Sequence, residues 1–200
     1  LFRSTDGGFR FDYVSLPCGA DKPDNSHGYT EPTLARLPNN DLLAVSRVEY
    51  HGPMRVMMQF RSADEGLTWT APEICPGVPP VYPVRKIPVV NEGKTHLNAV
   101  AVSPDLVVLP NGVAVLTYGR PGQYLAFSED GSGAEWHDRI AIVPEHSLFG
   151  TNDASSAMAG VTAIGDDEVL LVYDVRNYQS AELLTPANTV FALRVRIKVA

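Results

Sequence analysis

Two carboxylates and two arginines stand at similar places, within one or two residues of each other, in two copies of a repeated stretch of this sequence. Glu31 and Asp105 each lie beside a proline at the opening of an apolar run, and Arg47 and Arg120 end the runs that follow. Hydrolysis of a glycosidic bond usually requires two carboxyl groups, one as acid and the other as base or nucleophile. A guanidinium group binds a carboxylate through two parallel hydrogen bonds. This combination predicts catalysis by Glu31 and Asp105 on an acidic sugar held by Arg47 and Arg120.

Each of these residues also has a purely structural interpretation. Glu31 would form an ion pair with Arg36 or Arg47, and Asp105 would accept hydrogen bonds from backbone groups beside its proline. The arginines would stay solvated or pair with nearby carboxylates, as most surface arginines do. Polar residues of the neighbouring predicted loops complete the substrate-binding candidates, which besides the two arginines are His96, Asn98, Asp153 and Arg176.

These candidates are positioned by a pattern of apolar run, polar turn and apolar run that occurs three times. The copies cover residues 31–47, 103–119 and 158–174. Their turns consist of Pro, Asn, Asp and Gly, the residues that suit tight turns, so each copy predicts a β-hairpin. The apolar runs are nearly continuous, which predicts strands covered on both faces near the axis of a radial array.

A second pattern, Ser-x-Asp-x-Gly-x-Thr-Trp, is complete at residues 62–69. Altered copies occur at 4–11, where Phe replaces Trp, and at 128–136, where one residue is inserted. In such a turn the serine and aspartate side chains bond local backbone N–H groups, glycine takes a conformation that other residues resist, and the aromatic ring packs beneath. Asp6, Asp64 and Asp130 are therefore predicted to hold the fold and to take no part in catalysis.

Together the two patterns predict an all-β chain of four-stranded antiparallel blades, the unit of a β-propeller. Third strands are expected at 55–62 and 123–128, and fourth strands at 67–74 and 135–143. The blade pieces cover about 1–16, 29–75, 98–143 and 155–200 of one partial domain. About three blades are too few to close a ring, so we expect the C-terminal part of a larger propeller. Both kinds of turn belong to one end of the blades, which gathers the candidate residues at the other.

The complete turn at 62–69, together with Glu31-Pro32, Arg36-Leu37-Pro38, Arg47 and Tyr118-Gly119-Arg120-Pro121, resembles the sialidase superfamily, whose repeat is called the BNR or Asp-box repeat. The resemblance implies a six-bladed propeller and a sialidase-like glycoside hydrolase acting on a glycan that contains sialic or uronic acid. It also implies three substrate-binding arginines, an aspartate acid/base, and a tyrosine nucleophile assisted by a glutamate. That tyrosine would stand near residues 155–160, where the chain has none.

Two alternatives therefore stay open beside the hydrolase. One is a propeller that binds carbohydrate or protein without cleaving it, which the missing tyrosine favours. The other is a lyase acting on uronate polysaccharides, which would use the same arginines to hold the acidic sugar.

The composition indicates a folded protein whose partner is a carbohydrate. The 16 basic and 23 acidic residues give a net charge of -7, which disfavours nucleic acid as a partner. Apolar stretches are too short to span a membrane, and neither a metal nor another cofactor is predicted. Cys18 and Cys75 are too few for a disulfide framework and are expected to be buried free thiols. A secreted or periplasmic location is favoured.

Overall fold

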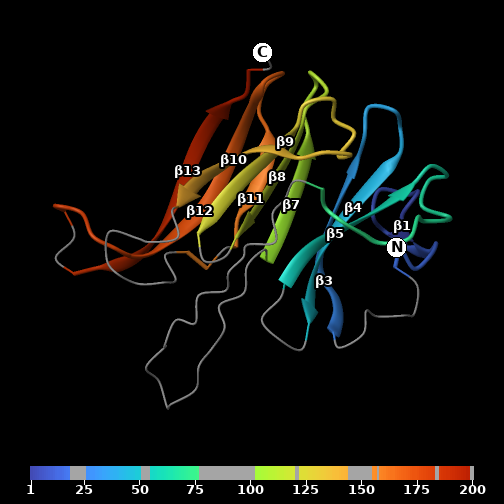
Figure 1. Cartoon of the computed structure of the whole chain (residues 1–200), viewed down its shortest axis with the longest axis horizontal. Helices are drawn as coiled ribbons and strands as arrows, with labels where there is room; N and C mark the ends of the chain where they lie inside the picture. Colours follow the sequence, from blue (N-terminus) through green and yellow to red (C-terminus); the bar gives the residue numbers. More distant parts are fainter. Residues whose placement is uncertain are drawn as a thin grey trace.

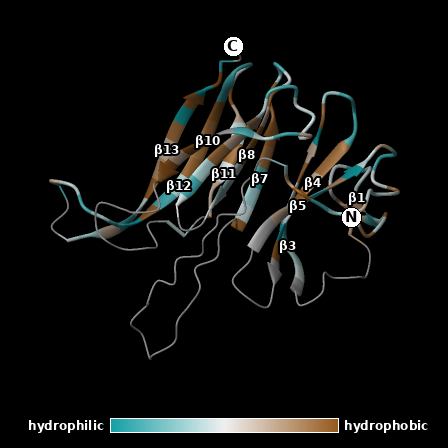
Figure 2. Ribbon diagram, viewed as in Figure 1, coloured by the Kyte–Doolittle hydropathy of each residue, from teal (hydrophilic) through white to brown (hydrophobic). Residues whose placement is uncertain are grey.

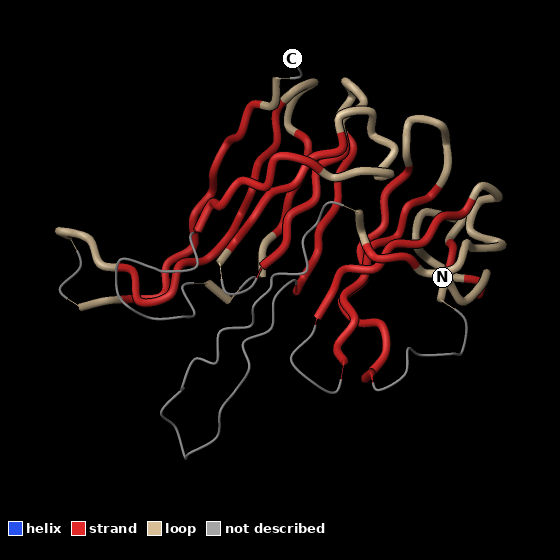
Figure 3. The backbone as a smooth tube through the Cα atoms, in the orientation of Figure 1, coloured by secondary structure: helices blue, strands red, loops and turns tan. Residues whose placement is uncertain are grey.

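The computed structural model of the chain describes residues 1–18, 26–50, 55–76, 102–119, 122–143, 155–156, 158–182 and 185–198. Within these ranges all regular structure is β, with thirteen strands and no helix (Figure 3). The predicted all-β class is thus confirmed for the described residues. None of them belongs to a helix long and apolar enough to cross a membrane.

The strands form four antiparallel sheets in which strands adjacent in sequence pair with each other (Figure 1). A small N-terminal sheet contains β1 (Phe2–Arg3) and β2 (Asp12–Tyr13). The second sheet contains β3 (Ser26–Arg36), β4 (Leu42–Tyr50), β5 (Arg55–Ser62) and β6 (Glu73–Ile74). The third contains β7 (Val102–Val108), β8 (Ala114–Gly119), β9 (Gln123–Ser128) and β10 (His137–Val143). The last contains β11 (Gly160–Ala163), β12 (Glu168–Tyr178) and β13 (Ala187–Arg196).

The three predicted hairpins are present as β3–β4, β7–β8 and β11–β12. Their turns use residues that tolerate a left-handed backbone: Asn40 has a φ of 72° and Gly112 a φ of 93°. The third strands β5 and β9 also have the predicted bounds. These boundaries follow from apolar runs that turn residues interrupt on both sides.

The three larger sheets stack face to face (Figure 1), and brown apolar stretches run along their strands in Figure 2. Leu43 and Val45 of β4 share a core with Leu116 of β8. Val115 points to the opposite face of β8 and packs in a second core with Leu171 of β12. Because side chains alternate across a strand, a nearly continuous apolar run gives the middle sheet two buried faces.

Burial within each sheet differs in one respect from the prediction. The sequence predicts that both hairpin strands are covered on both faces, whereas every residue is buried in β8 and β9, the second and third strands of their sheet. Exposure alternates along β3 near its hairpin, and Leu34 there is 44% exposed. β3 and β7 are edge strands, so the neighbouring sheets cover them less completely than the central strands.

The fourth strand of the second sheet is shorter than predicted. β6 contains only Glu73–Ile74, although the apolar pattern predicts a strand over 67–74. The turn that begins at Ser62 occupies the chain through Trp69, and Pro72 has no N–H to donate to β5. The alignment with β5 then continues past the strand, because the Cys75 N–H donates to Met57 O at 2.9 Å.

The two ends of the stacked sheets carry different segments. At one end the hairpin turns lie together: the Asn111 N–H donates to Asp166 O at 3.3 Å, and Gly131 closely approaches Gly112 and Pro38. Gly131 belongs to the turn at 128–136, so both kinds of turn meet at this end, as predicted. Since β3 and β7 run towards their hairpin turns, their first residues lie at the opposite end.

Candidate functional site

The strands β3 and β7 share an unusual backbone feature at a residue that precedes proline. Glu31 precedes Pro32 and has a φ of 53°, and Ser103 precedes Pro104 and has a φ of 48°. The pairing register shifts at both places. Residues other than glycine rarely adopt a positive φ, and a residue that precedes proline normally takes an extended conformation. The same strained bulge thus recurs in two neighbouring sheets, and such strain clusters at functional sites.

The carboxylate of Glu31 bridges its own sheet and the next one. Its Oε1 forms an ion pair with Arg47 Nη1 at 3.0 Å, and its Oε2 accepts the backbone N–H of Ser103 at 2.7 Å. The Ser103 hydroxyl in turn lies 3.1 Å from Met158 Sδ. Glu31, Ser103 and Met158 are the first residues of the three copies of the hairpin pattern. Stacking of the sheets therefore brings equivalent residues of three sheets into contact.

Asp105 lies two residues beyond Ser103 and joins three strands. Its Oδ1 accepts the Leu106 N–H at 3.0 Å and the Thr33 hydroxyl of β3 at 3.2 Å. Its Oδ2 accepts the Val161 N–H of β11 at 2.9 Å. Both carboxylate oxygens thus have protein donors, two of them backbone groups, which is the structural alternative that the sequence offers for Asp105.

A related arrangement occurs in the last sheet, where Asp174 binds the segment just before β11. Its Oδ1 accepts the Ser155 hydroxyl at 2.9 Å, the Ser156 hydroxyl at 2.7 Å and the Ser156 N–H at 2.9 Å. Asp174 and Arg47 hold equivalent positions in the repeat. Arg47 binds Glu31 within the first strand of its sheet, and Asp174 binds the segment that leads into the first strand of its own sheet.

The candidate residues are distributed over this end of the sheets as follows. Glu31, Arg47 and Asp105 lie together where β3 meets β7, and Arg176 is half-buried on β12 of the last sheet. Four further candidates lie outside the described residues, namely His96, Asn98, Arg120 and Asp153.

Two contacts at this site depend on partners that sequence reasoning left open or missed. The ion pair of Glu31 forms with Arg47, while Arg36 lies at the hairpin end of β3 and pairs with Glu65. Ser103, which orients Glu31, does not belong to the candidate set derived from sequence. Alignment of the repeated hairpins, which places Ser103 opposite Glu31, is the signal that could have found it.

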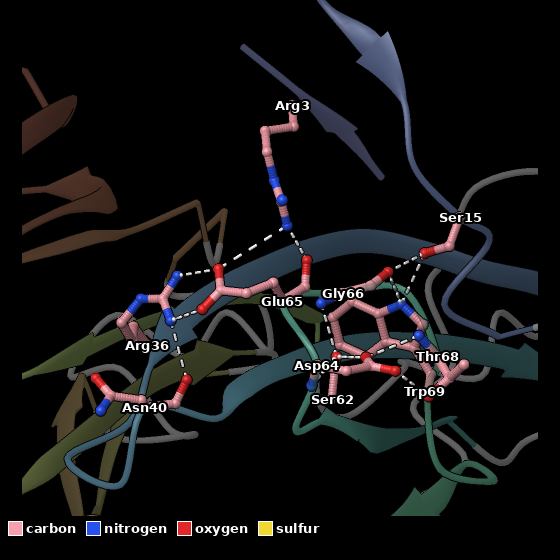
Figure 4. A network of polar contacts seen from close by, with 10 residues as sticks. All are labelled: Arg3, Ser15, Arg36, Asn40, Ser62, Asp64, Glu65, Gly66, Thr68 and Trp69. Carbon is pink, nitrogen blue, oxygen red and sulfur yellow. Dashed lines mark hydrogen bonds and ion pairs between the residues drawn. The ribbon is translucent and has the colours of Figure 1, made fainter. Parts of the chain in front are cut away.

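The Ser-x-Asp turns have the local hydrogen bonds that their sequence predicts, as Figure 4 shows for the second one. Asp64 accepts the Thr68 hydroxyl at 2.6 Å and the Thr68 N–H at 2.8 Å, and the Ser62 hydroxyl accepts the Gly66 N–H at 2.7 Å. Bonds from Thr68, and then from Ser62, lower the pKa of Asp64 to about 2. The carboxylate is therefore engaged by its own turn.

The other two turns repeat this chemistry. The pKa of Asp6 is lowered, first by the Arg10 N–H, and the pKa of Asp130 is lowered, first by the Ser132 N–H. In each turn the serine hydroxyl also donates to the aspartate, at 2.9 Å in the first and 3.0 Å in the third. The aspartates act as acceptors for the turn that contains them, as the sequence predicts.

The second turn also carries an exposed ion pair far from the Glu31 cluster. Arg36 Nη1 lies 2.7 Å from Glu65 Oε1, and Arg36 Nη2 lies 2.8 Å from Glu65 Oε2 (Figure 4). Arg3 of the N-terminal sheet donates to the Glu65 backbone carbonyl. Because the pair is exposed and close to the hairpin turn, it is a natural control for the pair at Glu31.

Aromatic residues pack beneath two of the three turns. Trp136 is only 2% exposed, and its Nε1 donates to Gln59 Oε1 at 3.2 Å. Trp69 Nε1 donates to Ser15 Oγ at 2.9 Å. The prediction is wrong for the first turn, where Phe11 is 63% exposed. The small sheet β1–β2 has no second sheet on that side within the described residues, so nothing there covers the ring.

A cavity of about 340 Å³ lies on the other face of the second sheet, towards the N-terminal segment. Its lining is mainly apolar and includes Leu16, Tyr29, Phe60 and Trp69. Pro32 and Thr33, which follow Glu31 in the chain, also line it, so the cavity adjoins the strand of the charged site, but Glu31, Arg47 and Asp105 are not part of its lining. Within the described ranges, no group of three or more His, Cys, Asp and Glu side chains is arranged to hold a metal ion.

A comparison with known protein families finds no match, and no curated protein matches the sequence. Solved structures do match. A protein of unknown function from Dyadobacter fermentans has 18% identity and a TM-score of 0.66 over 98% of this chain and 45% of its own. The GH93 α-L-arabinofuranosidase of Fusarium graminearum, in complex with arabinobiose, has 14% identity and a TM-score of 0.60 over 96% of this chain and 53% of its own.

A sialidase also belongs to these matches. A mutant of the NanB sialidase from Streptococcus pneumoniae has 15% identity and a TM-score of 0.52 over 86% of this chain and 23% of its own. The chain spans about half the length of the first structures that it matches. At these identities the likeness establishes the fold alone: the antiparallel sheets are arranged as in the β-propeller glycoside hydrolases.

Proposed function

We propose that this chain forms part of a sialidase-like β-propeller glycoside hydrolase whose sugar site surrounds Glu31 and Arg47. The observation that carries the proposal is the contact between Glu31, Arg47 and Ser103 across two sheets. It combines a partly exposed carboxylate, a guanidinium group and backbone strain at one end of a fold that glycosidases use. Glycosidases use carboxyl groups that flank the scissile bond, in sites where a few placed polar groups orient the sugar.

In this proposal Glu31 donates a proton to the glycosidic oxygen as its bond to the anomeric carbon breaks, water adds to that carbon, and the proton that the water releases returns to Glu31. Arg47 holds the side chain of Glu31 in position. A carboxylate fixed by a guanidinium group and a backbone N–H keeps one rotamer, which preserves its distance to a bound sugar. Asp105 has another task. Since Thr33, Leu106 and Val161 already donate to its two oxygens, we assign Asp105 to positioning the three strands.

The acidic-sugar version of the proposal follows from the arginines. Glu31 Oε1 already engages Arg47 Nη1, so a sugar carboxylate that binds Arg47 through two hydrogen bonds including Nη1 competes with Glu31 for that nitrogen. A uronate lyase would make the same demand.

Binding without cleavage is the second candidate, and one contact favours it. Each oxygen of Glu31 already has a protein partner, Arg47 for Oε1 and Ser103 for Oε2. A carboxylate so engaged is less available for proton transfer. A site of this kind still recognises sugar hydroxyl groups.

The experiment is a measurement of turnover and binding on the purified protein with a panel of glycosides and oligosaccharides. The hydrolase predicts cleaved products that have gained water, and Glu31→Gln should reduce turnover about 100-fold or more while binding persists. Glu65→Gln, which changes the exposed pair with Arg36, should leave turnover unchanged. Bound but uncleaved sugar would assign the chain to the binding class, and products carrying a double bond would identify a lyase.

A further inference from the structure

Resting on the proposed function, we infer that the Glu31–Arg47 site recognises an uncharged sugar through its hydroxyl groups and discriminates against sugars that carry a carboxylate. The sequence predicts that Arg47 holds an acidic sugar, and it gives an ion pair between Glu31 and Arg47 only as one structural alternative. In the structure Arg47 Nη1 lies 3.0 Å from Glu31 Oε1, so a protein carboxylate already engages one nitrogen of this guanidinium group and compensates its charge. Whether the site prefers a neutral or an acidic sugar then depends on the net charge and the hydrogen-bonding groups of the Glu31–Arg47 pair.

Burial makes this pair difficult to separate. The side chain of Arg47 is 13% exposed and that of Glu31 is 31% exposed. Charges in such surroundings are screened less than surface charges, and their attraction is stronger than in water. A sugar carboxylate would either displace Glu31, which costs this attraction, or lie beside it, which brings two negative charges together.

The second oxygen of Glu31 increases the cost of displacement. Oε2 accepts the Ser103 N–H at 2.7 Å, and this bond spans two sheets at two strained residues. Moving Glu31 away would leave a partly buried backbone donor without its acceptor, which is expensive for a buried amide. The geometry therefore holds Glu31 at Arg47 when a ligand arrives.

Other described charges at this end of the sheets do not reverse the balance. The charged groups described above at this end of the sheets are three carboxylates and two guanidinium groups. The carboxylates are those of Glu31, Asp105 and Asp174, and the guanidinium groups are those of Arg47 and Arg176. Asp105 and Asp174 both accept backbone N–H groups, so they stay in place. Among these five described groups the carboxylates outnumber the guanidinium groups, so together they provide no net attraction for a ligand carboxylate.

A neutral sugar finds complementary groups at the same place. A carboxylate accepts hydrogen bonds from hydroxyl groups, a guanidinium group donates to hydroxyl oxygens, and a serine hydroxyl does both. Glu31, Arg47 and Ser103 thus present acceptors and donors side by side. Two adjacent hydroxyl groups of a sugar ring satisfy such a pair without disturbing its charge balance.

The test uses matched sugars that differ only at C6, such as glucosides against glucuronides and galacto-oligosaccharides against galacturono-oligosaccharides. Calorimetry and thermal shift measure binding by the wild-type protein, which should prefer the neutral member of each pair by about tenfold or more. Glu31→Gln leaves Arg47 with an uncompensated charge and should move the preference about tenfold towards the acidic member. Glu65→Gln should leave both affinities as they are.

The outcomes separate this inference from the proposed function. Tighter wild-type binding of the acidic members would overturn the neutral-sugar inference and leave the glycoside hydrolase proposal standing. Binding of neither member of any pair would contradict the proposed function itself. If Glu31→Gln does not fold, the salt dependence of wild-type binding decides. Affinity that hardly changes between low and high salt supports a neutral ligand, whereas a steep loss with salt indicates an ionic contact and overturns the inference.

Discussion

The carboxylate of Asp105 accepts the backbone N–H of Val161 at 2.9 Å and so ties β7 to the first strand of the next sheet. Its other oxygen accepts the Leu106 N–H and the Thr33 hydroxyl. One side chain thus connects three sheets at the end where the candidate site lies. The stability of this connection can be measured separately from any catalytic effect.

Two replacements of Asp105 should lower the free energy of unfolding by different amounts. Asp105→Ala removes the acceptor of two backbone donors and should cost about 1–3 kcal/mol of unfolding free energy. Asp105→Asn retains one carbonyl oxygen and should cost less. Urea denaturation followed by tryptophan fluorescence gives both values. Wild-type stability in both variants would mean that Asp105 does not join the sheets and would favour the catalytic role that the sequence predicts for it.

The turn around Asp64 should make stability depend on pH. Bonds from Thr68 and Ser62 lower its folded-state pKa from 3.8 to about 2. The ionised carboxylate therefore stabilises the folded state fully above its ordinary pKa, and this contribution is lost as the pH falls towards 2. Compared with Asp64→Asn, the wild-type protein should be more stable at neutral pH, and the difference should shrink in that acidic window. A difference that stays constant on acidification would refute this account.

The indole of Trp136 should be difficult to replace. It is buried and donates to Gln59 Oε1 at 3.2 Å, and Gln59 itself is completely buried. Trp136→Phe removes this donor and should cost about 1–3 kcal/mol for the unsatisfied amide oxygen, in addition to lost packing. Trp69→Phe is the matched control, because Trp69 is only half-buried. Each substitution removes an indole hydrogen bond, so equal losses of unfolding free energy would show that burial of the Gln59 contact adds no cost.

The two cysteines should react with thiol reagents at very different rates. Both are free, and burial raises the pKa of each thiol, more strongly for the fully buried Cys75 than for the half-buried Cys18. Titration with a chromogenic disulfide at mildly alkaline pH should modify Cys18 first, with Cys75 becoming reactive only on unfolding. Cys18→Ser identifies the slow thiol. Fast reaction of Cys75 in the native protein would contradict its burial.

Local sequence was sufficient to predict the hairpins, most of the strands and the turns of this fold. The repeated hairpins, the strands β5 and β9 and the hydrogen bonds of the turn at 62–69 depend on residues close together in the chain. Apolar runs and turn residues specify such features directly. Where an element deviates, as in the shortened β6, the reason is also local, since Pro72 has no N–H to donate to β5.

The site was decided by tertiary structure. Sequence places Arg36 and Arg47 equally within reach of Glu31, and only the register of β3 on β4 selects Arg47, because it sends Arg36 to the far end of the strand. Ser103 lies 72 positions beyond Glu31 and meets it only through the stacking of two sheets. The net charge that a ligand meets at the site depends on such non-local pairs. Residue types and their spacing do not specify which pairs form.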